Sequence, residues 1–84
     1  MENTLEIWDE AKLKLQFSGR LLVNTSDKHY KFWSAEVNEE GNGYTAYYGR
    51  IGSAIRKSII GTWGPEREIN KKVKEKIKKG YREI

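Results

Sequence analysis

The stretch that decides the fold is residues 30–62, YKFWSAEVNEEGNGYTAYYGRIGSAIRKSIIGT. Two turn sequences divide it: residues 38–43 are polar and contain two glycines, and residues 52–54 are Gly-Ser-Ala. Three segments rich in aromatic and β-branched side chains remain, as is typical of strands. They are residues 30–37, 44–51 and 55–62. Because consecutive strands joined by short turns lie side by side, the sequence predicts an antiparallel meander.

The chain before this stretch carries a weaker strand pattern. Residues 13–17 (LKLQF) alternate apolar and polar, which is the period of a half-buried strand, and residues 20–23 predict a second strand. The turn sequence Ser18-Gly19 between them suggests a hairpin. The first dozen residues are compatible with a strand, a short helix or a loose arm. Their apolar residues are Leu5, Ile7 and Trp8.

A helix is predicted over residues 65 to about 79. Pro65 suits its first position because the missing N–H has no partner there, and Gly80 suits its C-terminal end. Acidic residues fall in the first turn and lysines in the last, as the helix dipole favours. Apolar residues recur every four positions and form a narrow stripe: Ile69, Val73 and Ile77. A helix with so narrow a stripe needs another surface to pack against. The sequence therefore predicts an α+β fold, an antiparallel sheet with one C-terminal helix packed across one face.

Most of the large side chains are expected to serve packing. Phe32 and Trp33 are adjacent on one predicted strand, so one should meet the helix and the other the far face. We expect Trp63 in the core, and Tyr81 and Ile84 to bring the C-terminus back to the sheet. The lysines of the predicted helix are expected to be mostly solvated: Lys71, Lys72, Lys74, Lys76, Lys78 and Lys79.

Length and composition exclude several classes of protein. Eighty-four residues allow one domain, 1–84, with 1–18 as an N-terminal extension or extra strand and 20–84 as its core. No apolar run is long enough to span a membrane, and the acidic N-terminus is no secretory signal, so we expect an intracellular protein, cytoplasmic or nucleoid-associated. No cysteine is present and His29 is the single histidine, which argues against a disulfide scaffold, a zinc site and triad chemistry.

The sequence offers no candidate catalytic site. Glu39 and Glu40 lie in a turn beside glycines, where solvated carboxylates are expected, and His29 has no evident partner. Residues 49–52 lack the Gly-Lys-Ser/Thr of a phosphate-binding loop and open no helix. We therefore expect no enzyme, no cofactor and no metal.

Charge is distributed unevenly along the chain. Residues 1–42 carry a net charge of −3, whereas residues 43–84 carry eleven Lys/Arg and four Asp/Glu, a net charge of +7. One-sided basic character is typical of a surface that meets a polyanion. A lysine-rich helix surface that is merely solvated would look the same in composition.

Tyr48 and Arg50 form the candidate binding pair. Residues two apart on a strand point to the same face, and Gly49 between them lets the backbone approach another surface closely. The tyrosine ring can stack on a base or sugar, and the guanidinium can bind phosphate with two donors. Tyrosine and arginine are also ordinary strand and surface residues, so the spacing alone is a weak signal.

Three motifs together resemble the WGR domain family over residues about 21–84. Residues 48–52 (YGRIG) resemble its signature, with tyrosine in the place of tryptophan. Lys31-Phe32-Trp33 resembles its upstream aromatic strand, and residues 79–81 (KGY) resemble its usual ending. The family occurs in DNA-dependent poly(ADP-ribose) polymerases, in bacterial proteins described as molybdate metabolism regulators, and as small stand-alone proteins. The resemblance implies a sheet with a helix on one side and, in the polymerases, binding near DNA breaks with relay to neighbouring domains.

The resemblance also implies roles for individual residues. Tyr48 falls where the family's tryptophan contacts the sugar–phosphate at a DNA end, Arg50 where an arginine contacts DNA or a partner domain, and Lys31 where a lysine approaches phosphate. Tyr30 stands where the family often has asparagine, and Ile55-Arg56 replaces a common Gly-Gln. No polymerase domain is present, so ADP-ribosyl transfer does not carry over.

The sequence thus predicts a monomeric, stand-alone WGR-like module that binds duplex DNA at ends or nicks. The candidate nucleic-acid-binding residues are Lys31, Tyr48, Gly49, Arg50, Arg56 and Lys57. Two alternatives stay open. The same face could dock onto another protein, or the chain could be an accessory subunit of a DNA-processing or regulatory complex.

Overall fold

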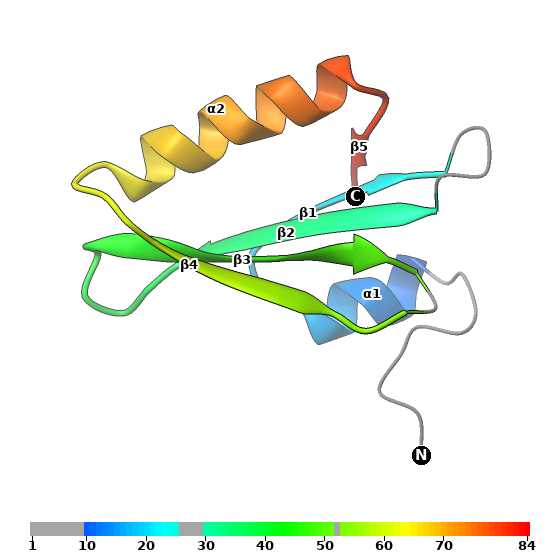
Figure 1. Ribbon diagram of the computed structural model, residues 1–84, viewed down its shortest axis with the longest axis horizontal. Coiled ribbons are helices and arrows are strands. Elements are labelled where there is room, and N and C mark those ends of the chain that lie inside the picture. The colour runs from blue at the N-terminus through cyan, green and yellow to red at the C-terminus, as the bar shows by residue number, and fades with distance from the viewer. Residues whose placement is uncertain (1–9, 26–29, 52) are drawn as a thin grey trace.

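A five-stranded antiparallel sheet forms the middle layer of the protein in this computed structural model, which describes residues 10–25, 30–51 and 53–84 (Figure 1). The strand order is β4-β3-β2-β1-β5, and α2 and α1 lie on opposite faces of the sheet. In chain order the elements are α1 (Glu10–Gln16), β1 (Arg20–Asn24), β2 (Lys31–Val37), β3 (Gly43–Arg50), β4 (Arg56–Gly61), α2 (Pro65–Lys78) and β5 (Arg82–Glu83). This arrangement confirms the predicted α+β class and the predicted meander. In the part of the chain described, neither helix is long and apolar enough to cross a membrane.

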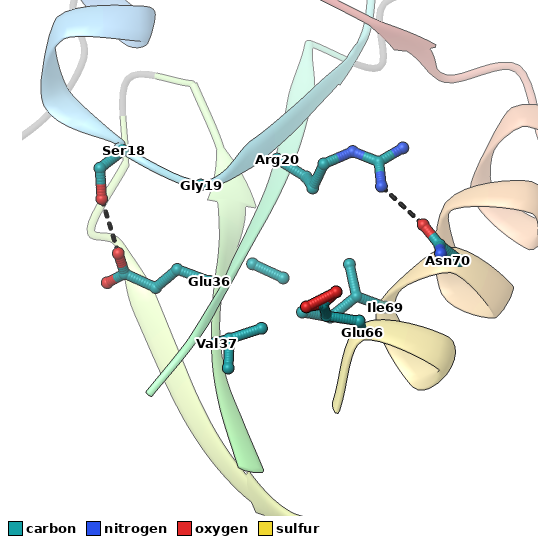
Figure 2. A pocket seen from close by; sticks show the side chains of 9 residues that line it. Ser18, Gly19, Arg20, Glu36, Val37, Glu66, Ile69 and Asn70 are labelled. Atoms are coloured by element: carbon teal, nitrogen blue, oxygen red, sulfur yellow. Dashed lines mark hydrogen bonds between the residues drawn. The ribbon is translucent and has the colours of Figure 1, made fainter. Parts of the chain in front are cut away.

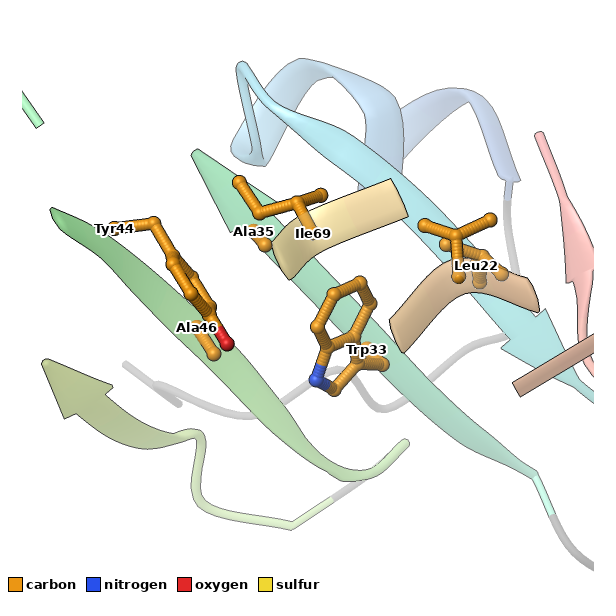
Figure 3. Close-up of a cluster of buried hydrophobic side chains, with 7 residues drawn as sticks. Leu22, Trp33, Ala35, Tyr44, Ala46 and Ile69 are labelled. Carbon is orange, nitrogen blue, oxygen red and sulfur yellow. The ribbon is translucent and has the colours of Figure 1, made fainter. Parts of the chain in front are cut away.

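Alternate residues of the central strand β2 are buried on opposite faces of the sheet. Trp33 and Ala35 face α2, whereas Phe32 faces α1, so the prediction that Phe32 and Trp33 diverge is confirmed. The α2-side cluster is Leu22, Trp33, Ala35, Tyr44, Ala46, Ile69 and Val73 (Figure 3). The α1-side cluster is Leu13, Phe17, Leu21, Val23 and Phe32. The domain therefore has two small cores, separated by the sheet.

The predicted strand at residues 13–17 is wrong, because this segment belongs mostly to helix α1. A strand would place Leu13, Leu15 and Phe17 on one face, but only Leu13 and Phe17 are buried while Leu15 is 88% exposed. Residues four apart share one face of a helix, so the helix covers the sheet with both apolar residues and leaves Leu15 in water. The predicted hairpin is therefore wrong too, and β1 pairs with β2 instead.

Gly19 makes the connection from α1 into β1 possible. A Cβ atom at this position would lie 2.0 Å from the carbonyl oxygen of Ala35, closer than any side chain tolerates. The absence of a side chain lets the chain pass directly over β2 as it enters β1. A hydrogen bond from the Ser18 hydroxyl to the Glu36 carboxylate (2.6 Å) holds the same crossing.

Helix α2 begins at Pro65 as predicted and packs on the sheet through Ile69 and Val73. Ile77, the third residue of the predicted stripe, is 50% exposed, so the prediction for that residue is wrong. The helix ends where the N–H of Tyr81 donates to the carbonyl of Lys76, and Gly80 has a φ of +103° that favours glycine. This left-handed turn directs the chain back toward the sheet.

The C-terminus forms a short strand that the sequence pattern did not predict. Strand β5 pairs with β1, and the N–H of Ile84 donates to the carbonyl of Leu21. Two guanidinium nitrogens of Arg20, Nε and Nη2, donate to the Glu83 carboxylate in an ion pair that stabilises β5. The third, Nη1, donates to the side-chain oxygen of Asn70 (2.7 Å). The ion pair raises the pKa of Arg20 and lowers that of Glu83. Tyr81 packs against the α2-side cluster and Ile84 against the α1-side cluster. The prediction that both residues return to the sheet is therefore confirmed.

Trp63 is the clearest misprediction among the aromatic residues. It was expected in the core, yet 97% of it is exposed, whereas Trp33 is buried as predicted. Trp63 lies in the short connection between β4 and α2, where the chain turns away from the sheet. His29, Leu5, Ile7 and Trp8 lie outside the described residues.

Replacement of Val73 by aspartate should lower the free energy of unfolding by roughly 3–5 kcal/mol, because it places a charge in the α2-side cluster. The matched control is Ile77→Asp on the same helix, which should cost less than about 1.5 kcal/mol because Ile77 is half exposed. Urea unfolding monitored by circular dichroism measures both. Equal losses for the two variants would contradict the packing described for α2.

Candidate nucleic-acid interface

A basic hollow lies between the C-terminal half of α2 and the β3–β4 side of the sheet. It consists of two neighbouring pockets, here called its lobes, of about 540 and 350 Å³, and Tyr48 and Lys76 line both. The larger lobe is also bounded by Lys31, Arg50, Arg56 and Tyr81. The smaller lobe is also bounded by Trp33, Tyr44, Lys72, Glu75 and Lys79. Cations therefore surround a space whose walls include several aromatic rings.

Strand register brings four of the predicted binding residues to one face. Lys31 lies opposite Arg50, and Tyr48 lies opposite both Trp33 on β2 and Arg56 on β4. Directly opposed residues in an antiparallel pair point to the same side of the sheet. Because Trp33 faces α2, Lys31, Tyr48, Arg50 and Arg56 share that face. Their side chains thus converge on the basic hollow.

Lys57 does not belong to this group. It lies opposite Tyr47, which packs against the α1-side cluster, so its side chain projects from the other face of the sheet. Lys57 and its neighbour Arg56 are both exposed and basic, yet they face opposite directions. The sequence alone placed both in one candidate set, and the structure separates them.

Gly49 serves the chain's own packing as well as lining the larger lobe. Its φ is +150°, and a Cβ atom there would lie 3.2 Å from the carbonyl oxygen of Ala54 and 3.8 Å from the Phe32 ring. The close backbone approach expected at this glycine is thus made to the loop after β3.

Lys76 is the site residue that the sequence analysis missed. Its ammonium nitrogen lies 5.9 Å from the centroid of the Trp33 ring and 5.2 Å from that of Tyr81, within the range of cation–π contacts. Burial lowers the pKa of Lys76, and the neighbouring cations Lys79, Lys72 and Lys31 lower it further, while Glu75 opposes the change. The signal was in the sequence, because residues 69, 73 and 76 follow the i, i+4, i+7 spacing of one helix face.

The cations of the hollow have little compensating negative charge. Within the described parts of the chain, no carboxylate lies within ion-pairing distance of Lys31, Arg50 or Arg56. The recorded pair at the rim, Lys72 with Glu75, is solvent-exposed and 3.9 Å long. Burial raises the pKa of Tyr81, whose ring lies beneath the Lys76 ammonium. The hollow is suited chemically to an anionic group that is joined to flat rings or an extended chain, as the phosphates of a nucleic acid are.

A second hollow, of about 690 Å³, at the opposite end of α2 has the contrary character (Figure 2). Arg20, its one cation, is already bound to Glu83 and Asn70, and Glu36 and Glu66 contribute carboxylates to the lining. Negative charge there disfavours phosphate. Over residues 10–25, 30–51 and 53–84, no group of three or more His, Cys, Asp or Glu residues is placed to hold a metal ion.

No protein-family model, curated protein or solved structure matches this chain. A function must therefore be inferred from the chain's own residues and their geometry.

Replacement of Lys76 by methionine should leave the free energy of unfolding unchanged at pH 7 or raise it, by at most about 1 kcal/mol because the site is partly solvated. The reason is that a lysine pKa below its unfolded value of 10.5 means that folding disfavours the charged form. This penalty is complete at neutral pH and disappears as the pH rises through the lowered pKa toward 10.5. Wild-type stability relative to the variant should therefore rise over that range.

Urea unfolding at neutral and alkaline pH measures this difference. Lys74→Met, on the exposed side of the same helix, is the control that removes an equal charge outside the hollow. A loss of more than about 1 kcal/mol in Lys76→Met at pH 7 would show that the cation–π contacts outweigh desolvation.

Proposed function

We propose that the protein is a nucleic-acid-binding module that holds DNA in the basic hollow, close to an end or a nick, and has no catalysis of its own. The observation that carries this proposal is the convergence of Lys31, Arg50, Arg56 and Lys76 around Tyr48. These residues come from three strands and a helix, so their convergence is a property of the fold. A merely solvated lysine-rich helix does not require basic residues on the sheet to face it.

Phosphate groups are the part of DNA that the cations would bind. Arginine can present two parallel donors to a phosphate, and each neutralised phosphate releases condensed counterions. Lys76 has the most to gain, because a phosphate would neutralise a cation that burial and neighbouring lysines currently disfavour. The hollow would thus exchange repulsion among its own cations for attraction to the ligand.

Tyr48 supplies the means to distinguish an end from a continuous duplex. It is 37% exposed and lies between the cations of the two lobes. A terminal sugar or base can reach such a ring, whereas bases within an intact duplex stay stacked on their neighbours. The resemblance of residues 48–52 to the signature of the WGR domain family supports the same interpretation.

The salt dependence of binding should reflect the hollow. With about three to five phosphates contacted, the logarithm of the affinity should fall with the logarithm of salt concentration at a slope of roughly −3 to −4. Arg56→Ala should reduce this slope by about 1. Lys57→Ala removes the adjacent charge on the opposite face and should leave the slope nearly unchanged. Fluorescence anisotropy with a short labelled duplex at several salt concentrations measures all three proteins, and equal effects of the two substitutions would reject the hollow as the site.

Recognition of ends should depend on Tyr48 and Arg50 in particular. Arg50→Ala should weaken binding to linear DNA by roughly 1.5–3 kcal/mol and Tyr48→Ala by roughly 1–3 kcal/mol, with smaller effects on covalently closed circles. Lys74→Ala on the exposed side of α2 is the control and should affect both DNA forms slightly and alike. Direct competition between linear and circular DNA of one sequence measures the difference. Equal losses on both forms would leave a basic surface without end recognition, and salt-independent binding would favour protein docking.

A further inference from the structure

Strand β4 forms an open edge of the sheet. Its only strand neighbour among the described residues is β3, so one row of its backbone donors and acceptors faces away from the sheet. Proteins usually protect such edges with charge, proline or a covering segment because they can pair with another chain. The first two residues of β4 are basic, but residues 58–63 (SIIGTW) carry no charge.

Two large apolar side chains are exposed along this uncharged segment. Ile59 is 71% exposed, and Trp63, just beyond the end of the strand, is 97% exposed. Lys57 guards one end of this edge, on the same face as Ile59, but residues 58–63 offer no further charge to keep another chain from pairing there. The pattern therefore points to a surface that is covered in the functional form of the protein.

We propose that β4 is a self-association surface on which two copies of the protein pair antiparallel, with the twofold axis at Ile59. The axis places Ile59 of each copy opposite Ile59 of the other, so the exposed apolar side chains cover one another. It also keeps α2 of both copies on the same side of one continuous sheet, since opposed residues share a face. This inference goes beyond the proposed function and does not depend on it.

The charges of β4 fit this register. Lys57 of one copy lies opposite Gly61 of the second copy, and Ser58 lies opposite Ile60, so no cation faces another. Open space surrounds Gly61, where an added Cβ atom would meet nothing within 4 Å, which leaves room for the aliphatic part of a lysine. Parallel pairing in register would instead set Arg56 and Lys57 beside the same residues of the second copy, which is unfavourable.

The distribution of charge along β4 favours a second copy of the protein as the chain that pairs with this edge. The two basic residues of β4 lie at its start and its uncharged residues follow, so an antiparallel partner with the same sequence sets no cation opposite another. One strand from each copy makes a small interface, below the roughly 1,600 Å² of a standard complex, so we expect a concentration-dependent dimer.

The absence of cysteine makes a cross-linking experiment specific. In Ile59→Cys the only two thiols of a dimer would lie across the pair, where Cβ atoms are about 4.5–5.5 Å apart and need a small shift to form a disulfide. Mild oxidation of dilute protein should convert most of this variant into a covalent dimer. Leu15→Cys, which puts an equally exposed thiol on α1, is the control and should stay mostly monomeric. Equal cross-linking of the two variants would overturn the proposal.

Sedimentation equilibrium of the full chain over a range of concentrations tests the same interface without oxidation. The wild type should change from monomer to dimer, and Ile59→Lys, which sets two ammonium groups face to face, should weaken the dimer at least about tenfold. Leu15→Lys adds the same charge elsewhere and should leave the dimer intact. Because Ile59 is largely exposed, circular dichroism should show that its lysine variant is folded. A wild type that stays monomeric at all concentrations, or a dimer that is insensitive to Ile59→Lys, would overturn the proposal.

Discussion

The central strand β2 has to bury both of its faces at once, and the rest of the structure depends on that constraint. Phe32 and Trp33 are adjacent in the chain but belong to cores on opposite sides of the sheet. Each core is too small to stand without a cover, so α1 covers one and α2 the other. The same alternation sends Lys31, at the start of β2, to the α2 face, where it lies opposite Arg50. The position of the basic hollow thus follows from the way in which β2 is buried.

The elements that the sequence predicted well are those whose pattern admits one solution. The aromatic and β-branched segments around the glycine turns could only be strands, and Pro65, Gly80 and the spacing of Ile69 and Val73 fit only a helix. Residues 13–17 were ambiguous, because Leu13 and Phe17 satisfy both an alternating strand and the four-residue spacing of a helix. The outcome was decided by the uncovered face of the sheet, which is a tertiary feature. Strand β5 is too short to carry a pattern, and its pairing with β1 depends on where α2 happens to end.

The candidate site was predicted in part for a similar reason. The common face of Tyr48 and Arg50 follows from their spacing along one strand, and the register agrees with it. Arg56 and Lys57 point to opposite faces because they are adjacent on one strand. Which of them shares the face of Tyr48 depends on the register between β3 and β4, which the residue types do not reveal. Lys76 was overlooked because a lysine in a lysine-rich helix gives no compositional signal. Its position relative to Ile69 and Val73 was the available indication that it faces the sheet.

Lys76 shows most directly why stability alone does not explain this surface. Its position on α2 faces Trp33 and Tyr81, where an apolar side chain would extend the α2-side cluster without any charge to desolvate. A lysine there keeps a cation partly buried and close to Lys72 and Lys79, and its lowered pKa records that cost. Under the proposed function, a bound phosphate would offset the repulsion between Lys76 and its neighbouring lysines, which would favour a lysine at this position. Lys31 and Arg50 are directly opposed like charges at the end of the sheet, which an antiparallel pair disfavours, and under the proposed function a bound anion would relieve this repulsion.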